Sequence, residues 1–260
     1  MSILVTGASG FIGGAVADTL LSDGYEVVLS VRKTLANKEG ATQIDLDLST
    51  GINPEVFERL RPLGVKTIVH CAAITPWLKN ADYTLDQSMA RSVVALTKEL
   101  GVERVIHISG WNVYDMSHSK PPYGEATSLN PDTPYGKSKL EVEEILQSEL
   151  GDTVTSLRFA SVYGPGQQSP GLITGLVRNA LRGEPLLVNA KLTRRDYMYI
   201  DDAVDAVVTL IDLPGQLPRA INIGSGSSVT IEDVAIKVAK ACKELLQKDV
   251  TVSVAEELQE

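Results

Sequence analysis

The chain has few cysteines and few histidines for its 260 residues. The two cysteines, Cys71 and Cys242, form no CxxC pair and cannot build a disulfide framework. We expect both to be buried as small apolar side chains, with one bond between them as the alternative. The histidines His70, His107 and His118 lack the spacing of metal ligands, so no metal site is predicted.

Long apolar runs and an excess of basic charge are also missing. No segment is long and apolar enough to span a bilayer, and no basic segment with an apolar signal region opens the chain. The 24 Lys and Arg residues against 33 Asp and Glu residues give a formal charge of −9. A chain this acidic has no general attraction for nucleic acids or anionic membranes, so we expect neither as a partner. A cytoplasmic location is the default expectation.

Short apolar segments alternate with amphipathic ones along most of the chain. Apolar strands separated by helices of period 3.6 are typical of a parallel sheet covered on both faces. The fold expected is therefore α/β, a Rossmann-type doubly wound parallel sheet with a small C-terminal lobe. Strands are expected at residues 3–5, 26–31, 43–46, 67–71, 104–109, 153–159 and 220–223, and helices at 12–20, 83–100, 134–150, 172–181, 201–213 and 231–246.

A glycine-rich turn joins the first strand to the first helix, in the run Thr6-Gly-Ala-Ser-Gly-Phe-Ile-Gly13. Gly7 permits the tight turn, Gly10 lets the backbone approach a diphosphate, and Gly13 lets the helix pack closely on the sheet. The free N–H groups and dipole of the helix N-terminus favour phosphate. A purely structural glycine turn is the alternative. The predicted cofactor contacts are Gly7, Ser9, Gly10, Phe11 and Ile12.

The position of this motif defines the expected domain organisation. Residues 1–163 are predicted to form a dinucleotide-binding Rossmann domain. After Tyr163 the pattern loosens through a proline- and glycine-rich stretch at 164–171. Residues 164–260 are expected to form mainly a substrate-binding lobe, with segments that return to the Rossmann core.

The residues after the second strand bear on the choice of dinucleotide. An NAD site usually has an acid there for the ribose 2′-hydroxyl, whereas this chain has Arg32 and Lys33. Both could bind a 2′-phosphate, so NADP is favoured over NAD; a solvated pair of loop charges is the alternative. After the third strand, Asp47 could accept a hydrogen bond from the adenine amino group, with Asp45 as the competing residue.

Tyr135 and Lys139 form a YxxxK pair at the start of a predicted helix. Residues i and i+4 share one helix face, which places an ammonium group beside a phenol. Such a neighbour favours the phenolate form and suits a general acid/base for hydride transfer at a carbinol or carbonyl. Lys139 could also bind the nicotinamide ribose. Lys137 lies off that face.

Taken together and in order, these motifs resemble the NAD-dependent epimerase/dehydratase family, the extended short-chain dehydrogenase/reductases. The resemblance runs from Ile3 to about Val234. Besides the two motifs above, it depends on the runs Ile68-Val-His-Cys-Ala-Ala73, Gly101-Val-Glu-Arg-Val-Ile-His-Ile-Ser109, Arg158 to Gly166, Arg195-Asp-Tyr-Met-Tyr-Ile-Asp-Asp202 and Ile221-Asn-Ile-Gly-Ser-Gly226.

The resemblance implies further roles. Ala72 and Ala73 would line the cofactor cleft, Ala160 would lie near the nicotinamide, and Arg195 would reach a substrate diphosphate unless an aspartate pairs with it. The helices at 83–100 and 134–150 would form a homodimer, although their apolar stripes could be used entirely on the sheet. The remaining expected contacts are Leu48 and Cys71 to the cofactor, and Trp111, Asn112 and Ser161 to the substrate.

The chain departs from the family pattern at the end of the fifth strand. Members carry a serine or threonine four residues before a Val-Tyr tyrosine, and that hydroxyl binds the substrate oxygen. Counting back from Tyr114 gives Gly110. Ser109 is named as the catalytic hydroxyl instead, although on a strand it would point to the other face unless a bulge intervenes. Asn112 or a water could substitute. Ser161, where sugar-nucleotide members often carry asparagine, is a second departure.

Two functions are therefore weighed. The first is an NAD(P)-dependent reductase, epimerase or dehydratase that acts by hydride transfer on a nucleotide-sugar or a similar small carbonyl or alcohol. The second is a dinucleotide-binding regulatory or scaffold protein with weak catalysis, which Gly110 favours. The intact Tyr135 and Lys139 favour the enzyme, because a non-catalytic protein has no chemical need for that pair.

Overall fold

The chain divides into two compact units. The computed structural model describes residues 2–36, 38–168, 170–189 and 193–254. The first unit comprises Met1–Phe159 and Asp201–Ile223, and the second comprises Ala160–Ile200 and Gly224–Glu260. The helix and strand formed by 201–223 thus belong with the N-terminal part of the chain.

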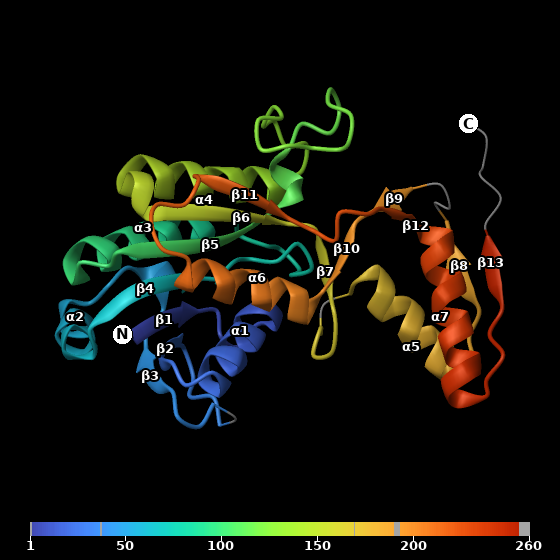
Figure 1. Cartoon of the computed structure of the whole chain (residues 1–260), viewed down its shortest axis with the longest axis horizontal. Coiled ribbons are helices and arrows are strands. Elements are labelled where there is room, and N and C mark those ends of the chain that lie inside the picture. The colour runs from blue at the N-terminus through green and yellow to red at the C-terminus, as the bar shows by residue number, and fades with distance from the viewer. Residues whose placement is uncertain (1, 37, 169, 190–192, 255–260) are drawn as a thin grey trace. The chain divides into compact units, whose positions relative to one another are not determined.

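A seven-stranded parallel sheet forms the centre of the first unit (Figure 1). Its strand order is β3-β2-β1-β4-β5-β6-β11, with the order reversing on either side of β1. This arrangement confirms the predicted Rossmann-type fold and brings the carboxyl ends of β1, β4 and β5 to one edge. The strands are β1 Ser2–Thr6, β2 Glu26–Val31, β3 Thr42–Asp45, β4 Val65–His70, β5 Arg104–Gly110, β6 Val154–Phe159 and β11 Ala220–Ile223.

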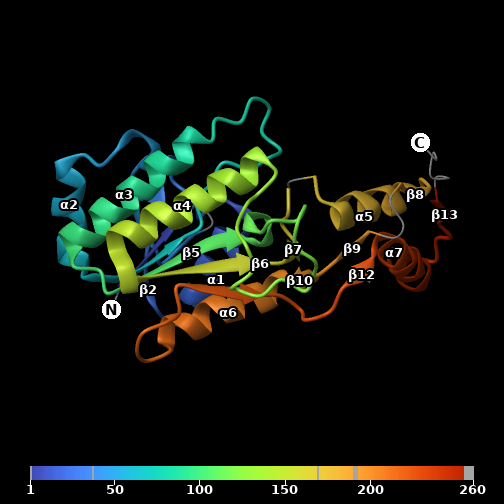
Figure 2. The ribbon, with the colours of Figure 1, turned by 90° about the horizontal axis from the view of Figure 1, so that it is seen from above.

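Helices cover both faces of this sheet. Figures 1 and 2 show α1 (Phe11–Ser22) and α6 (Ile200–Asp212) on one face. On the other face α2 (Pro54–Leu60), α3 (Thr84–Leu100) and α4 (Pro134–Leu150) enclose a core with the strands. Single 3-10 turns occur at Leu48–Thr50, Arg61–Leu63, Trp111–Val113 and Gly151–Thr153.

The second unit is built around two helices, α5 (Leu172–Arg182) and α7 (Ile231–Leu246), which share a small apolar core. Its strands pair as β7 with β10 and β8 with β13, both parallel, and β9 with β12, antiparallel. Their bounds are β7 Ser161–Tyr163, β8 Leu186–Val188, β9 Arg194–Arg195, β10 Tyr197–Tyr199, β12 Val229–Thr230 and β13 Val252–Val254.

The cysteines and the predicted lack of a membrane-spanning segment can be compared with this fold. Cys242 is buried in the core of the second unit, Cys71 is half-buried after β4, and both thiols are free. Within the described part of the chain, no helix combines the length and apolar character needed to cross a bilayer.

Candidate active site

The glycine turn after β1 is packed directly against the chain that follows β4. Gly7 has a positive φ of 69°, and a Cβ on it would lie 2.7 Å from the backbone nitrogen of Ala72. A Cβ on Gly13 would collide with the Gly7 carbonyl group. Gly10 closes the turn by donating a 2.8 Å hydrogen bond from its N–H to the Gly7 carbonyl. Positions 7 and 13 therefore require glycine for close approach, as the motif predicts.

The N-terminus of α1 is left open for a ligand. Gly10 is the N-cap and offers no side chain to the first turn, which also contains no acidic residue. Ser9 and Gly10 are exposed, whereas Phe11 and Ile12 are half-buried. Free N–H groups at a helix N-terminus bind phosphate, so this turn fits the diphosphate of a dinucleotide.

Hydrogen bonds tie the end of β4 to this turn. The Thr6 hydroxyl lies 2.8 Å from His70 Nδ1 and accepts from the N–H of Ala72 at 3.2 Å. Burial raises the pKa of the Cys71 thiol to about 12, against the opposing effect of the Lys139 charge. Cys71 is thus uncharged at neutral pH, and Ala72 and Ala73 present a small, uncharged wall beside the turn.

The residues expected at the adenosine end lie after β2 and β3. Arg32 and Lys33 are both exposed. The Asp47 carboxylate accepts from the N–H and hydroxyl of Ser49 at 2.9 and 2.6 Å. These bonds lower the pKa of Asp47, with a smaller contribution from the charge of Arg32. Asp47 therefore caps a turn and lies within electrostatic reach of Arg32, while the Leu48 side chain is buried.

Tyr135 and Lys139 lie together on the first two turns of α4. The Lys139 Nζ lies 5.9 Å from the centroid of the Tyr135 ring and donates a 2.9 Å hydrogen bond to the carbonyl of Ile108. Lys139 is buried and Tyr135 is half-buried, whereas the neighbouring Lys137 is exposed. Thr133 fixes the start of the helix by accepting from the N–H of Gly136 at 3.0 Å. An immobile ammonium group beside a phenol suits proton transfer.

The Ser109 hydroxyl is bound by a different residue of α4. It donates a 2.5 Å hydrogen bond to the Glu143 carboxylate inside the core. The register of β5 with β6 runs without a shift from Val105 to Gly110, so the described strands contain no bulge that could turn Ser109. The hydroxyl named for catalysis thus faces α4 from the body of the strand.

Sequence reasoning missed the network that binds Ser109. The Arg158 guanidinium forms an ion pair of 2.7 Å with Glu143 and donates to the Tyr114 hydroxyl at 3.1 Å. Tyr114 in turn donates to Asn222 Oδ1 at 2.6 Å. Two signals were available: Glu143 lies eight residues after Tyr135 on one helix stripe, and Arg158 is a charge inside an apolar strand.

Trp111 and Asn112 form the 3-10 turn that follows β5, and both are half-buried. The Asn112 carbonyl packs against Gly136 so closely that a Cβ on that glycine would collide with it. The turn is thereby held against the first turn of α4, next in sequence to Tyr135.

Three residues expected near nicotinamide or substrate belong to the second unit. Ala160 and Ser161 are half-buried, and the N–H of Ser161 donates to the Asp196 carbonyl at 3.0 Å. Arg195 is exposed on β9. Asp196, which sequence reasoning did not single out, accepts from the N–H and hydroxyl of Ser225 at 3.0 and 2.7 Å. It thereby shapes the glycine-rich turn at 224–226.

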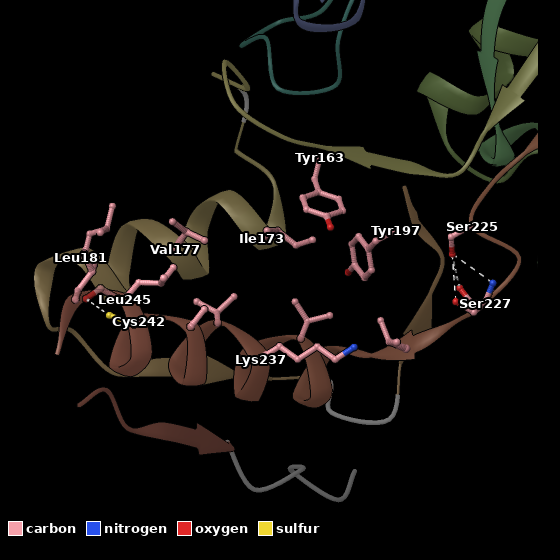
Figure 3. Close-up of a pocket in the computed structure, with 16 residues that line it drawn as sticks. Tyr163, Ile173, Val177, Leu181, Tyr197, Ser225, Ser227, Lys237, Cys242 and Leu245 are labelled. Carbon is pink, nitrogen blue, oxygen red and sulfur yellow. Dashed lines mark hydrogen bonds between the residues drawn. The ribbon is translucent and has the colours of Figure 1, made fainter. Parts of the chain in front are cut away.

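The second unit contains a cavity of about 660 Å³ (Figure 3). Apolar side chains of α5 and α7 form its walls, among them Ile173, Val177 and Leu245. Hydroxyl and ammonium groups mark its other end, supplied by Tyr163, Tyr197, Ser225, Ser227 and Lys237. Burial raises the pKa of Tyr197, while the nearby charge of Arg195 acts in the opposite direction, so Arg195 lies within electrostatic reach of this polar end.

Comparison with known proteins identifies clear relatives. Residues 3–224 match the NAD dependent epimerase/dehydratase family. The chain is 30% identical to UDP-glucose 4-epimerase of Mycolicibacterium smegmatis, over 93% of this chain and 82% of that protein. A solved NAD dependent NDP-hexosamine 5,6-dehydratase, TunA, is 28% identical with a TM-score of 0.80, over 98% of this chain and 84% of the other. MoeE5 in complex with UDP-glucose and NAD is 28% identical with a TM-score of 0.79, over 99% and 86%.

Proposed function

Because the chain belongs to the NAD dependent epimerase/dehydratase family, we propose that it acts on a nucleotide-linked sugar by reversible hydride transfer, with NADP preferred over NAD. The family makes it an enzyme of the extended short-chain dehydrogenase/reductase type that uses a nicotinamide dinucleotide. The regulatory or scaffold alternative is not favoured, since the similar proteins described above are named as enzymes.

One observation carries the proposal: Lys139 holds its ammonium beside the Tyr135 ring while the strand carbonyl of Ile108 fixes it. Tyr135 would take the proton from a sugar hydroxyl while the carbon that bears this hydroxyl loses hydride. In the reverse step Tyr135 would return the proton. Bound nicotinamide would supply the hydride acceptor. Lys139 would place its ammonium group beside the phenol during this transfer.

The chain's own residues fit a dinucleotide. A Cβ at Gly7 or Gly13 would collide with the chain's own backbone, so these glycines keep the turn tightly packed, and the uncapped start of α1 provides N–H donors that suit a diphosphate. The preference for NADP is supported by Arg32 and Lys33, which are exposed directly after β2 where an acid would favour NAD.

The second unit is assigned the substrate-binding role on two grounds. Arg195 is an exposed cation beside the polar end of the cavity, and a guanidinium suits a diphosphate. Ser225, Ser227 and Lys237 add hydroxyl and ammonium groups at the same end. UDP-glucose is the first substrate to test, because MoeE5 was solved with it.

A homodimer through α3 and α4 remains a prediction. The apolar stripe of α3, including Met89, Val93 and Leu96, is buried within its own chain. Because this stripe is already used inside the chain, it gives no independent support for a dimer.

The proposal is tested by cofactor binding and by turnover. NADPH and NADH are titrated by fluorescence against the wild type, Arg32→Ala and the control Arg59→Ala, which removes an exposed arginine of α2. Losing a phosphate-paired arginine costs about 1.5–3 kcal/mol, so Arg32→Ala should weaken NADPH binding roughly tenfold to hundredfold and leave NADH binding and the control unchanged.

For turnover, the wild type is incubated with UDP-glucose and the oxidised cofactor, NADP⁺ or NAD⁺, which can accept the hydride, and the sugar products are separated and identified by NMR. An epimer or a keto sugar would each support the proposal. Binding of neither dinucleotide would contradict it, and equal binding of both in wild type and Arg32→Ala would remove the NADP preference alone.

A further inference from the structure

Gly110 has no backbone reason to be glycine. It ends β5 with φ −158° and ψ 164°, an extended conformation open to every residue. A Cβ built on it would nevertheless lie 2.8 Å from the side-chain oxygen Oδ1 of Asn112. The next nearest group, the Phe159 carbonyl oxygen, is at 3.8 Å, which is ordinary contact. The space beside Gly110 is therefore taken by the Asn112 amide.

The same asparagine is fixed beside the proposed acid/base. Its backbone carbonyl packs against Gly136, the residue that follows Tyr135 on α4. A Cβ at Gly110 would push the Asn112 amide aside, whereas a Cβ at Gly136 would collide with the Asn112 backbone and also with Pro131 and Thr133. The backbone of Asn112 is therefore packed tightly against the helix that carries Tyr135, and its side-chain amide lies beside Gly110.

The Asn112 amide has unused hydrogen-bonding capacity within the described part of the chain. Asn112 is half-buried, and no group among the described residues forms a hydrogen bond with its side chain. A primary amide offers two N–H donors and one acceptor and does not titrate. On a turn packed against the residue that follows Tyr135, it suits a sugar oxygen that alternates between hydroxyl and carbonyl.

We propose that the Asn112 side-chain amide binds the reacting oxygen of the substrate, in the place that a hydroxyl side chain at position 110 would occupy, and that Gly110 is the space this amide requires. The inference rests on the proposed function. An amide can orient and stabilise this oxygen but cannot relay its proton. The proton moves only between the substrate oxygen and Tyr135, so a single ionisation should govern kcat.

The activity test compares Asn112→Ala, Gly110→Ser and the double variant Gly110→Ser/Asn112→Ala. Losing one preorganised donor costs about 10²–10³-fold in kcat, so Asn112→Ala should fall by about that factor with the NADPH Kd unchanged. The double variant should recover at least about tenfold of this loss, because the serine hydroxyl then has room. Asn53→Ala, at the exposed N-cap of α2, is the matched control and should keep wild-type kcat.

A stability cycle tests the shared space without any activity. Gly110→Ser should lower the Tm by about 2–4 °C when Asn112 is present, since the amide must move aside, and by less beside Asn112→Ala. Equal shifts in both backgrounds would overturn the inference. Wild-type kcat in Asn112→Ala, or a double variant no better than Asn112→Ala, would also overturn it.

Failure of the proposed function looks different. Wild type would then bind no dinucleotide or convert no sugar, and the whole inference about substrate would fall with it. The cycle would still report the steric coupling between Gly110 and Asn112. The result that assigns the amide to the substrate is an active wild type, a strong loss of turnover in Asn112→Ala, and partial recovery in the double variant.

Discussion

The ammonium group of Lys139 donates a hydrogen bond of 2.9 Å to the carbonyl oxygen of Ile108. This bond crosses from α4 to β5, so the lysine is anchored to the sheet rather than held by the tyrosine it serves. The position of the positive charge therefore does not depend on the state of Tyr135.

Removing the two members of the pair should give different defects. Tyr135→Phe should lower kcat by about 10²–10⁴-fold and leave the Kd for NADPH near wild type, because only the proton transfer is lost. Lys139→Met should lower kcat and also weaken cofactor binding. Lys137→Met, an exposed lysine two residues away, is the control. Steady-state kinetics and fluorescence titration measure both quantities, and normal turnover in Tyr135→Phe would exclude it as the acid/base.

The buried ion pair of Glu143 and Arg158 should dominate the stability of the first unit near α4. Glu143→Ala leaves a buried guanidinium unpaired, which costs about 3–5 kcal/mol in the free energy of unfolding. Glu149→Ala breaks an exposed pair with Lys98, which solvent and salt screen, and should cost far less. Urea unfolding followed by circular dichroism compares the two variants, and similar midpoints would show that the buried pair has no special weight.

Two glycines of positive φ separate a steric clash from a backbone preference. Gly24 has φ 82° and nothing near its Cβ position, so Gly24→Ala should cost only about 1–2 kcal/mol. Gly7→Ala adds a collision with the Ala72 backbone and should cost more, with loss of NADPH binding. Thermal unfolding and cofactor titration provide the readouts; intact binding in Gly7→Ala would contradict the close-approach interpretation.

Stability should fall in mild acid because of a buried histidine. Burial, and then the charge of Lys139, lowers the pKa of His70 to about 3, and the same causes lower the pKa of His107. The unfolded chain has an ordinary histidine pKa near 6.5, so between about pH 3 and 6.5 it binds more protons than the folded chain. The stability that comes from burying these histidines in the neutral form is fully present above about pH 6.5 and is lost progressively as the pH falls toward 3. Urea unfolding from pH 7.5 to 5 should show this slope, reduced in His70→Gln; an unchanged slope would refute it.

Neighbouring arginines in the second unit should differ in substrate binding. Arg194 donates from Nε to the Ser228 hydroxyl at 3.0 Å, away from the tyrosines of the cavity. Arg195 donates to the Arg194 carbonyl at 3.1 Å and lies within electrostatic reach of Tyr197, which lines the cavity. Arg195→Met should weaken UDP-glucose binding by about tenfold to hundredfold, the worth of a charged hydrogen bond, and Arg194→Met much less. Isothermal titration calorimetry measures both, and an unaffected Arg195→Met would remove the diphosphate role.

Most of the sheet could be read from the sequence because its strands and helices are long and regular. The predicted bounds of β2, α4, β11 and α7 agree with the structure. Helix α2 was missed although Asn53, Pro54 and Glu55 form a good N-terminus, since seven residues give too little periodicity. The two- and three-residue strands of the second unit carry no pattern, because their pairing depends on partners far away in the chain.

In the candidate site, contacts within one helix could be predicted and contacts between different elements could not. The proximity of Tyr135 and Lys139 could be predicted because their spacing on one helix fixes their geometry. The partner of Ser109 could not, because it required knowing which residue of α4 meets which residue of β5. The contact between Gly110 and Asn112 could not be predicted either. These two residues face each other only because a 3-10 turn follows the strand.

Helix α4 carries Tyr135, Lys139 and Glu143 on one stripe, at intervals of four residues, and each meets a different partner. A deletion of one residue between them would rotate the downstream part by about 100° and turn Glu143 away from Arg158. A deletion in the loop at 116–122 would leave the stripe in phase. Natural length variation in this protein should therefore accumulate in that loop and be absent between 135 and 143.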